Sequence, residues 1–141
     1  MFVFDTDHIG IIQWQSEPAY SRLLARVSNY AASDFFVTIV SLHEEFLGWN
    51  AYIAKAKKID GVIKAYEKFK QILDDFETSQ VLPFDTAAAN QFVHLQRQKL
   101  QIGTMDLRIA AIALSRSMTL LTRNLQDFMR VPSLKLDDWT V

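Results

Sequence analysis

Polar side chains beside predicted strand ends and helix starts are the residues of this sequence best suited to chemistry. Four are carboxylates and one is an amide: Asp5, Glu44, Asp106, Asn124 and Asp127. Because the carboxyl ends of parallel strands meet at one edge of a sheet, side chains from separate stretches can converge there. Carboxylates in one crevice repel each other unless cations bind, and oxygen-only ligands favour Mg²⁺ or Mn²⁺ over zinc. Such a site is typical of phosphodiester hydrolysis.

The same carboxylates also have an ordinary structural interpretation. Asp5, Asp7 and Asp106 all stand where a helix N-cap is favourable, and Glu44 alone could be an exposed helix charge. On spacing alone, the sequence therefore indicates a metal site without separating it from helix capping.

Short apolar runs predict the strands that position these groups. Runs of strand-forming residues occur at 2–4, 35–40, 81–84 and 119–122. Helical patterns lie between the runs, with caps expected at Asp7, Ser41 and Asp85. Strands that alternate with helices predict an α/β fold around a mostly parallel sheet.

The predicted helices are amphipathic or buried. They are expected over about 8–15, 18–30, 42–49, 50–79, 86–102, 105–116 and 125–129. Within 50–79, apolar residues at steps of three and four form a core-packing seam: Ile59, Val62, Tyr66, Phe69, Leu73 and Phe76. Gly61 is expected to mark a break between two antiparallel helices. The segment 105–116 is apolar nearly all round, which predicts a buried helix.

Length and composition favour one soluble domain over residues 1–141. The 141 residues suffice for one core, and half of them are hydrophobic. No cysteine is present, so thiolate metal sites and disulfides are excluded. No signal peptide is recognisable, and no stretch approaches the roughly 20 apolar residues that span a bilayer. A cytoplasmic protein without membrane contact is expected.

The charges are unevenly distributed along a chain whose net charge is −1. Residues 91–130 carry six basic side chains against two acidic ones. That excess fits either contacts to phosphates or a solvated helix face. The histidines His8, His43 and His94 show no spacing of a shared metal site, and hydrogen-bonding or surface roles are expected for them. For Trp14, Trp49 and Trp139, packing is favoured over base stacking.

Four segments carry a family resemblance, in matching order and spacing. They are Phe4–His8 (FDTDH), Ser41–Gly48 (SLHEEFLG), Asp106–Ala111 (DLRIAA) and Leu121–Phe128 (LTRNLQDF). They resemble the successive motifs of PIN-domain ribonucleases, most of all the VapC toxins of bacterial toxin–antitoxin pairs. The ending Val131–Trp139 also fits, so the resemblance covers essentially the whole chain.

The resemblance implies a PIN-like three-layer α/β/α sandwich with a short, mostly parallel central sheet and a long helical hairpin insertion. It also implies Mg²⁺- or Mn²⁺-dependent cleavage of single-stranded RNA, leaving a 5′-phosphate and a 3′-hydroxyl. Asp5, Glu44 and Asp106 would be the metal ligands, and Thr6 and Thr122 supporting hydroxyls. The partners it implies are the RNA substrate, a small antitoxin protein and a second copy in a homodimer.

Two details depart from the family pattern or compete with it. Many members carry a fourth acidic residue where this chain has Asn124, so either Asn124 or Asp127 is expected to complete the catalytic set. The helical phase of Leu42, Phe46 and Trp49 places Glu45 nearer the buried seam, whereas the family register, counted back from Gly48, favours Glu44. The first turn of a helix points at the sheet edge, and Glu44 is therefore the predicted ligand.

Alternatives remain open at this point. Arg108 and Arg123, which flank the predicted ligands, either bind substrate phosphate or balance carboxylate charge. The chain could be a non-toxin PIN nuclease of RNA maturation, or a catalytically inactive PIN domain that only binds protein or RNA, as Asn124 suggests. A nucleotide-binding α/β domain is disfavoured because no Gly-rich loop follows the first strand.

Overall fold

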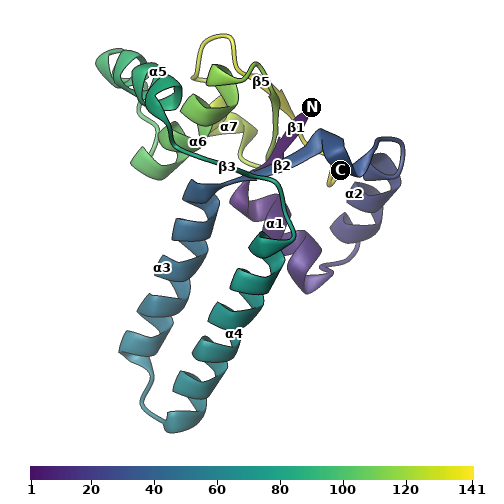
Figure 1. Cartoon of the computed structure of the whole chain (residues 1–141), viewed down its shortest axis with the longest axis vertical. Coiled ribbons are helices and arrows are strands. Elements are labelled where there is room, and N and C mark those ends of the chain that lie inside the picture. The colour runs from purple at the N-terminus through teal and green to yellow at the C-terminus, as the bar shows by residue number, and fades with distance from the viewer.

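A five-stranded parallel sheet with helices on both faces forms the centre of the protein (Figure 1), in a computed structural model that describes all 141 residues. The strands are β1 (Phe2–Phe4), β2 (Phe35–Thr38), β3 (Val81–Leu82), β4 (Thr119–Leu121) and β5 (Lys135–Asp137). The helices are α1 (Thr6–Trp14), α2 (Ala19–Val27), α3 (Ile39–Lys55), α4 (Ile59–Glu77), α5 (Thr86–Arg97), α6 (Thr104–Ser115) and α7 (Leu125–Phe128). The strand order is β3-β2-β1-β4-β5, and every pairing is parallel. The predicted α/β class is therefore confirmed.

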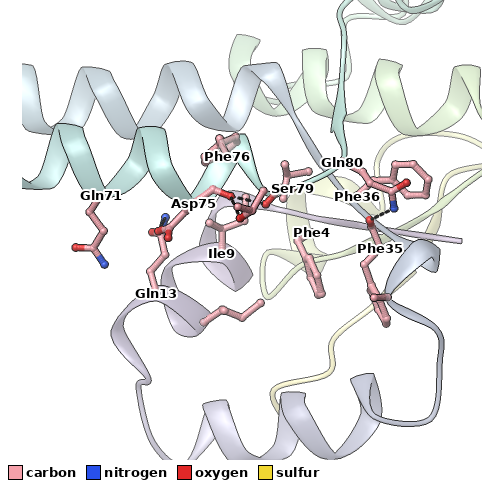
Figure 2. Close-up of a pocket in the computed structure, with 14 residues that line it drawn as sticks. Phe4, Ile9, Gln13, Phe35, Phe36, Gln71, Asp75, Phe76, Ser79 and Gln80 are labelled. Atoms are coloured by element: carbon pink, nitrogen blue, oxygen red, sulfur yellow. Dashed lines mark hydrogen bonds between the residues drawn. The ribbon is translucent and has the colours of Figure 1, made fainter.

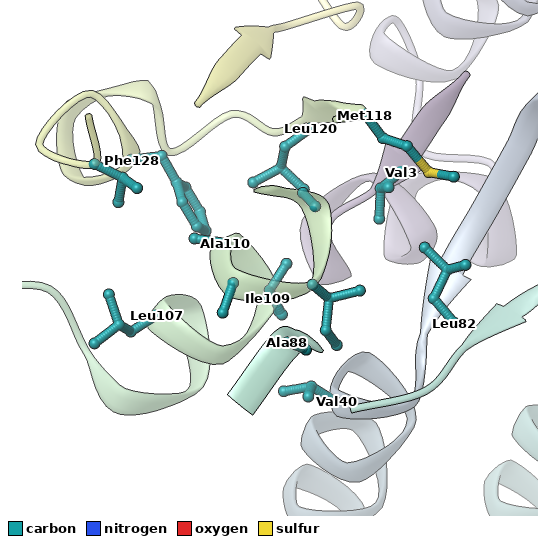
Figure 3. Packing of buried hydrophobic residues seen from close by; sticks show 14 of the residues in the cluster. Val3, Val40, Leu82, Ala88, Leu107, Ile109, Ala110, Met118, Leu120 and Phe128 are labelled. Carbon is teal, nitrogen blue, oxygen red and sulfur yellow. The ribbon is translucent and has the colours of Figure 1, made fainter. Parts of the chain in front are cut away.

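The two faces of the sheet bury two separate apolar clusters. Val3 and Leu120 face α5 and α6 in the larger cluster, where Ile109 and Phe128 are also fully buried (Figure 3). Phe4 and Leu121, the next residues along β1 and β4, point to the other face and pack against α1, α2 and α4. Alternation along β1 and β4 thus places helices above and below the sheet, which is the predicted three-layer arrangement.

The long helical hairpin is formed by α3 and α4, which run side by side and project away from the sheet (Figure 1). The break between them lies at 56–58, so the prediction of a break at Gly61 is wrong. Gly61 instead sits in the first turn of α4, where an added Cβ would approach the Cβ of Ala56 to 3.1 Å. Its missing side chain lets the two helices meet closely just after the turn.

The apolar seam predicted on this hairpin is only partly buried. Phe76 is buried as expected, but Ile59, Tyr66 and Leu73 are exposed. The inner face of α4 is formed by Ala65, Ile72 and Phe76 instead. The periodicity identified a helix correctly, but apolar residues on two neighbouring stripes left its buried side ambiguous.

Two helix caps lie earlier in the chain than predicted. Asp5, not Asp7, is the N-cap of α1, and its side chain accepts the backbone N–H of Thr6 at 2.8 Å. Thr38, not Ser41, caps α3 and accepts the N–H of Ser41 at 3.1 Å. Both helices therefore begin directly at the strand ends, and their first turns lie at the carboxyl edge of the sheet.

The remaining differences concern element ends. The structure has a fifth strand, β5, where the sequence predicts none, and α2 is shorter than the predicted 18–30. Asp85 caps α5 as predicted, accepting from the N–H of Ala88 at 3.0 Å. Helix α6 is buried along Ile109–Ala113, also as predicted. None of the helices combines the length and apolarity that crossing a bilayer requires.

Candidate metal centre

Three carboxylates from three different elements converge at the carboxyl edge of the sheet. Asp5 directly follows β1 and caps α1, Glu44 lies in the second turn of α3, and Asp106 lies in the first turn of α6. One oxygen from each lies within 4.8 Å of the others. This is the trio predicted from the sequence, and its members come together because α1 and α3 start where neighbouring strands end.

Asp5 is the most buried of the three, with 5% of its surface exposed. Its Oδ1 accepts the N–H of Thr6 and its Oδ2 accepts the hydroxyl of Thr122 at 2.8 Å. Burial, and next the nearby charge of Asp7, raise the pKa of Asp5 from 3.8 to about 7. Without a cation, the folded protein therefore disfavours the charge that this carboxylate carries as a ligand.

Glu44, rather than Glu45, faces the site. The hydroxyl of Thr6 donates to Oε1 of Glu44 at 2.7 Å, which holds the carboxylate beside Asp5. Glu45 points toward the hairpin side, where Nε2 of Gln13 donates to it at 3.3 Å. Burial is the main reason that the pKa of Glu45 rises from 4.5 to about 7. The helical phase correctly indicated that Glu45 is partly buried, and the first turns of α3 direct Glu44 to the sheet edge.

Asn124 connects Asp106 to Asp127. Its amide Nδ2 lies 3.4 Å from Oδ2 of Asp106 and 3.1 Å from Oδ2 of Asp127. Burial, followed by the charges of Glu44, Asp127 and Asp7, raises the pKa of Asp106 from 3.8 to about 6. Both residues predicted as candidates for the fourth position therefore lie next to the trio.

The two predicted supporting threonines both contact ligand carboxylates. Thr6 binds Glu44, and Thr122, which is fully buried, binds Asp5 while accepting the backbone N–H of Asn124 at 3.0 Å. The arginines differ from each other. The side chain of Arg108 lies against Phe92 and Met105, whereas Arg123 is exposed at the edge of the site.

Asp7 and His8 are two further residues of the site that are not among the predicted site residues. Asp7 was interpreted as a helix cap, but its Oδ2 accepts the N–H of Arg123 at 2.8 Å, directly after Thr122. His8 is fully buried, with Nδ1 2.8 Å from Oδ1 of Asp7. The signal that could have found them is the second carboxylate, two residues after Asp5, at the same strand end.

The donor set fits a hard divalent cation. All ligand atoms are oxygens, and none of the ion pairs in the structure involves Asp5, Glu44 or Asp106. Two of the three carboxylates have raised pKa values because burial and mutual repulsion are not offset by a basic side chain. A divalent cation between them would remove this repulsion, and Mg²⁺ and Mn²⁺ prefer such oxygen ligands.

Two cavities lie beside the carboxylates rather than around them. One of about 480 Å³ lies between α1, β2 and α4, with Ile9, Phe35 and Phe76 among its lining residues (Figure 2). A second of about 390 Å³ lies between α1, α3 and α4, and Thr6 is the residue that it shares with the metal centre. The chemistry is therefore assigned to the sheet edge by its donor atoms, not by cavity size.

Comparisons with known proteins give segmental sequence matches and full-length fold matches. No family model matches the chain. The tRNA(fMet)-specific endonuclease VapC of Salmonella typhimurium is 36% identical over 64 residues, which are 43% of this chain and 48% of that protein. The match thus spans about half the length of the curated relative.

Two solved structures resemble nearly the whole chain. A chain of VapBC-1 from nontypeable Haemophilus influenzae superposes with a TM-score of 0.76 at 23% identity, covering 99% of this chain and 98% of that one. A chain of DNA-bound VapBC from Salmonella typhimurium gives 0.72 at 26% identity, covering 98% and 97%. With the order of the motifs, the parallel sheet and the acidic edge, these matches show that the chain is similar to VapC-type PIN-domain proteins in sequence segments and in overall fold.

Proposed function

We propose that this protein is a metal-dependent endoribonuclease that hydrolyses phosphodiester bonds of single-stranded RNA, acting over residues 1–141 as the toxin of a toxin–antitoxin pair. The observation that carries the proposal is the convergence of Asp5, Glu44 and Asp106 within 4.8 Å at the carboxyl edge of the sheet. A helix cap explains Asp5 alone, but capping does not explain why three carboxylates from distant segments share one edge.

Asp5, Glu44 and Asp106 would hold Mg²⁺ or Mn²⁺. When bound, such an ion would supply an activated water and neutralise charge on the scissile phosphate. Thr122 and Thr6 orient the ligand oxygens of Asp5 and Glu44 through their hydroxyls. These hydrogen bonds matter because side chains that are already held in place bind a cation without losing further conformational freedom.

Asn124 and Asp127 complete the catalytic set in this proposal. Asn124 holds Asp106 through its amide and is itself held by its backbone N–H on Thr122. Asp127 adds negative charge that is shared with Arg130 at 3.4 Å. Asn124, which lies between β4 and α7, thus orients the carboxylate of Asp106, and the backbone of Asp106 belongs to α6.

RNA would approach over the exposed edge beside Arg123. This guanidinium is free to meet a phosphate, because its side chain makes no ion pair in the structure. Arg108 is a second candidate phosphate contact, although its guanidinium lies over the ring of Phe92 at 5.9 Å. Single-stranded RNA suits an open edge, where an unpaired backbone can bend to present one phosphate to the carboxylates. Products with a 5′-phosphate and a 3′-hydroxyl are expected from the family resemblance.

The proposed partners follow from the same similarity. The solved structures that the chain resembles are VapBC structures, which supports a small antitoxin protein as partner. A homodimer is the second assembly expected. Apolar side chains left exposed on the hairpin, among them Tyr66 and Leu73, are available for such contacts.

Cleavage of end-labelled RNA by the purified protein tests the proposal. A panel of single-stranded RNAs should be cut with Mg²⁺ or Mn²⁺, and cutting should stop with EDTA and in Asp5→Asn and Asp106→Asn. Asp85→Asn is a matched control, since Asp85 caps α5 outside the site. Intact RNA across the whole panel with Mn²⁺ present would reject the enzyme and favour a binding module, a role consistent with the amide of Asn124 in place of a carboxylate.

A further inference from the structure

We propose that Asp7, held in place by the buried imidazole of His8, is a positioning residue of the metal centre that raises the affinity of Asp5 and its neighbours for a divalent cation. This inference rests on the metal-dependent part of the proposed function. It adds a fifth carboxylate, besides Asp5, Glu44, Asp106 and Asp127, and a histidine that is not among the predicted ligands.

Asp7 has both carboxylate oxygens engaged by well-placed groups. Its Oδ1 lies 2.8 Å from Nδ1 of His8, and its Oδ2 accepts the N–H of Arg123 at 2.8 Å. The hydroxyl of Thr122 lies 3.4 Å from the same Oδ2 and donates to Asp5 at 2.8 Å. Asp7 therefore fixes the backbone that follows β4, and with it the threonine that orients Asp5.

The tautomer of His8 follows from its other contact. Nε2 of His8 accepts the backbone N–H of Trp139 at 3.4 Å, so that nitrogen carries no proton. The ring proton consequently sits on Nδ1 and is donated to Asp7. Asp138, the other acidic group near the ring, is already bound by the N–H and hydroxyl of Thr140 at 2.8 and 2.6 Å. The hydrogen bond of the ring N–H is therefore made to Asp7.

A fixed charge at this position acts on the ligands without occupying a ligand position. Asp7 contributes to the raised pKa of both Asp5 and Asp106, so its field reaches both carboxylates. The same field that disfavours their ionisation without metal favours a divalent cation between them. The negative charge of Asp7 next to Asp5 and Asp106 thus partly compensates for Asn124, whose side chain is neutral.

The hydrogen-bond pattern requires a carboxylate at position 7. An asparagine there has one oxygen and one NH₂ group, while His8 and Arg123 both present N–H donors to it. In either amide orientation one donor faces another donor. Reversing the tautomer of His8 moves the conflict to the N–H of Trp139, 3.4 Å from Nε2, where the nearest carboxylate oxygen, Oδ1 of Asp138, lies 3.7 Å away.

The test measures Mn²⁺ binding by electron paramagnetic resonance on wild type, Asp7→Asn, His8→Gln and His8→Asn. The amide of His8→Asn can place a donor near the Nδ1 position, whereas the longer side chain of His8→Gln places its amide near Nε2. We expect Asp7→Asn and His8→Gln to weaken Mn²⁺ binding by roughly 10- to 100-fold, and His8→Asn to stay within about threefold of wild type. Circular dichroism confirms that each variant is folded before binding is compared.

Two outcomes would overturn the inference. Equal weakening in His8→Gln and His8→Asn would mean that the ring only fills space. Binding within twofold of wild type in both Asp7→Asn and His8→Gln, or no Mn²⁺ binding by wild type, would remove any role of Asp7 at the metal. If wild type binds Mn²⁺ and the series behaves as expected but RNA stays intact, the proposed function fails while the inference stands.

Discussion

Thr6 donates its hydroxyl to Oε1 of Glu44 at 2.7 Å, which joins the first turn of α1 to the second turn of α3 at the edge of the sheet. The hydroxyl of Ser41 lies 3.0 Å from the same Thr6 oxygen and is fully buried. Two helices that begin at neighbouring parallel strands are thus tied together at their N-termini. The contact holds one of two adjacent glutamates, Glu44, at the candidate metal centre.

Glu44 and Glu45 should therefore respond differently to the same substitution. Glu44→Gln removes a charged ligand and is expected to lower RNA cleavage at least 100-fold and to weaken Mn²⁺ binding. Glu45→Gln should leave cleavage within about twofold, because Gln13 can still donate to the amide oxygen. Cleavage rates and Mn²⁺ titrations of the two variants, side by side, check this. Equal losses would mean that Glu45 also serves the site.

The free energy of unfolding of the metal-free protein should fall as the pH rises, because Asp5 and Asp106 ionise less readily in the folded protein than in the unfolded one. Asp5 and Asp106 have pKa values raised from 3.8 to about 7 and about 6. Folded protein therefore binds more protons than unfolded protein between pH 4 and 7, and stability is lost as pH rises through that window. For Asp5 alone the raised pKa corresponds to roughly 4 kcal/mol at pH 8.

Urea unfolding in EDTA at pH 5 and pH 8 measures this dependence. We expect lower stability at pH 8, recovery of most of the difference on adding Mn²⁺, and a more stable metal-free Asp5→Asn at pH 8. The isosteric amide keeps the fold but carries no charge. A metal-free protein that is equally stable at both pH values would show that the carboxylates do not repel each other as the geometry implies.

The layout of the site could be predicted because it depends on strand ends, which short apolar runs mark well. Asp5 and Asp106 were identified by both strand-end position and motif order. The phase of α3 was harder, since its first turn is set by Thr38 capping from inside the predicted strand. Because Thr38 is the N-cap, α3 begins at Ile39. Ile39 and Val40 are therefore helical, although both favour strands in isolation.

Contacts between distant segments could not be predicted from local patterns. His8 receives the N–H of Trp139 only because β5 pairs with β4 and brings the chain end beside α1. A three-residue strand of Lys135–Asp137 has one apolar residue and is too short for its alternation to mark it. The burial of α4 was misjudged for a related reason: α3, α1 and the sheet decide which of its two apolar stripes turns inward.

Asn124→Asp should make the protein more dependent on divalent cations. The amide now donates to Asp106 and Asp127, and a carboxylate in its place would repel both. We expect the metal-free variant to lose on the order of 1 to 2 kcal/mol of stability and to bind Mn²⁺ more tightly than wild type. Urea unfolding in EDTA and Mn²⁺ titration measure the two effects. Unchanged stability together with unchanged binding would place position 124 outside the centre.

Arg123→Ala should weaken RNA binding while leaving the metal centre intact. The guanidinium is exposed and makes no ion pair, whereas the backbone N–H of Arg123, which holds Asp7, survives the substitution. We expect KM for a short single-stranded RNA to rise about fivefold, equivalent to roughly 1 kcal/mol for one phosphate contact, with kcat and Mn²⁺ affinity unchanged. The salt dependence of KM should also become shallower by about 0.7 in a double-logarithmic plot. Lys57→Ala removes the same charge at the far end of the α3–α4 hairpin and should change neither quantity (Figure 1). If both variants raise KM equally, the effect is one of overall charge, and RNA does not pass over Arg123.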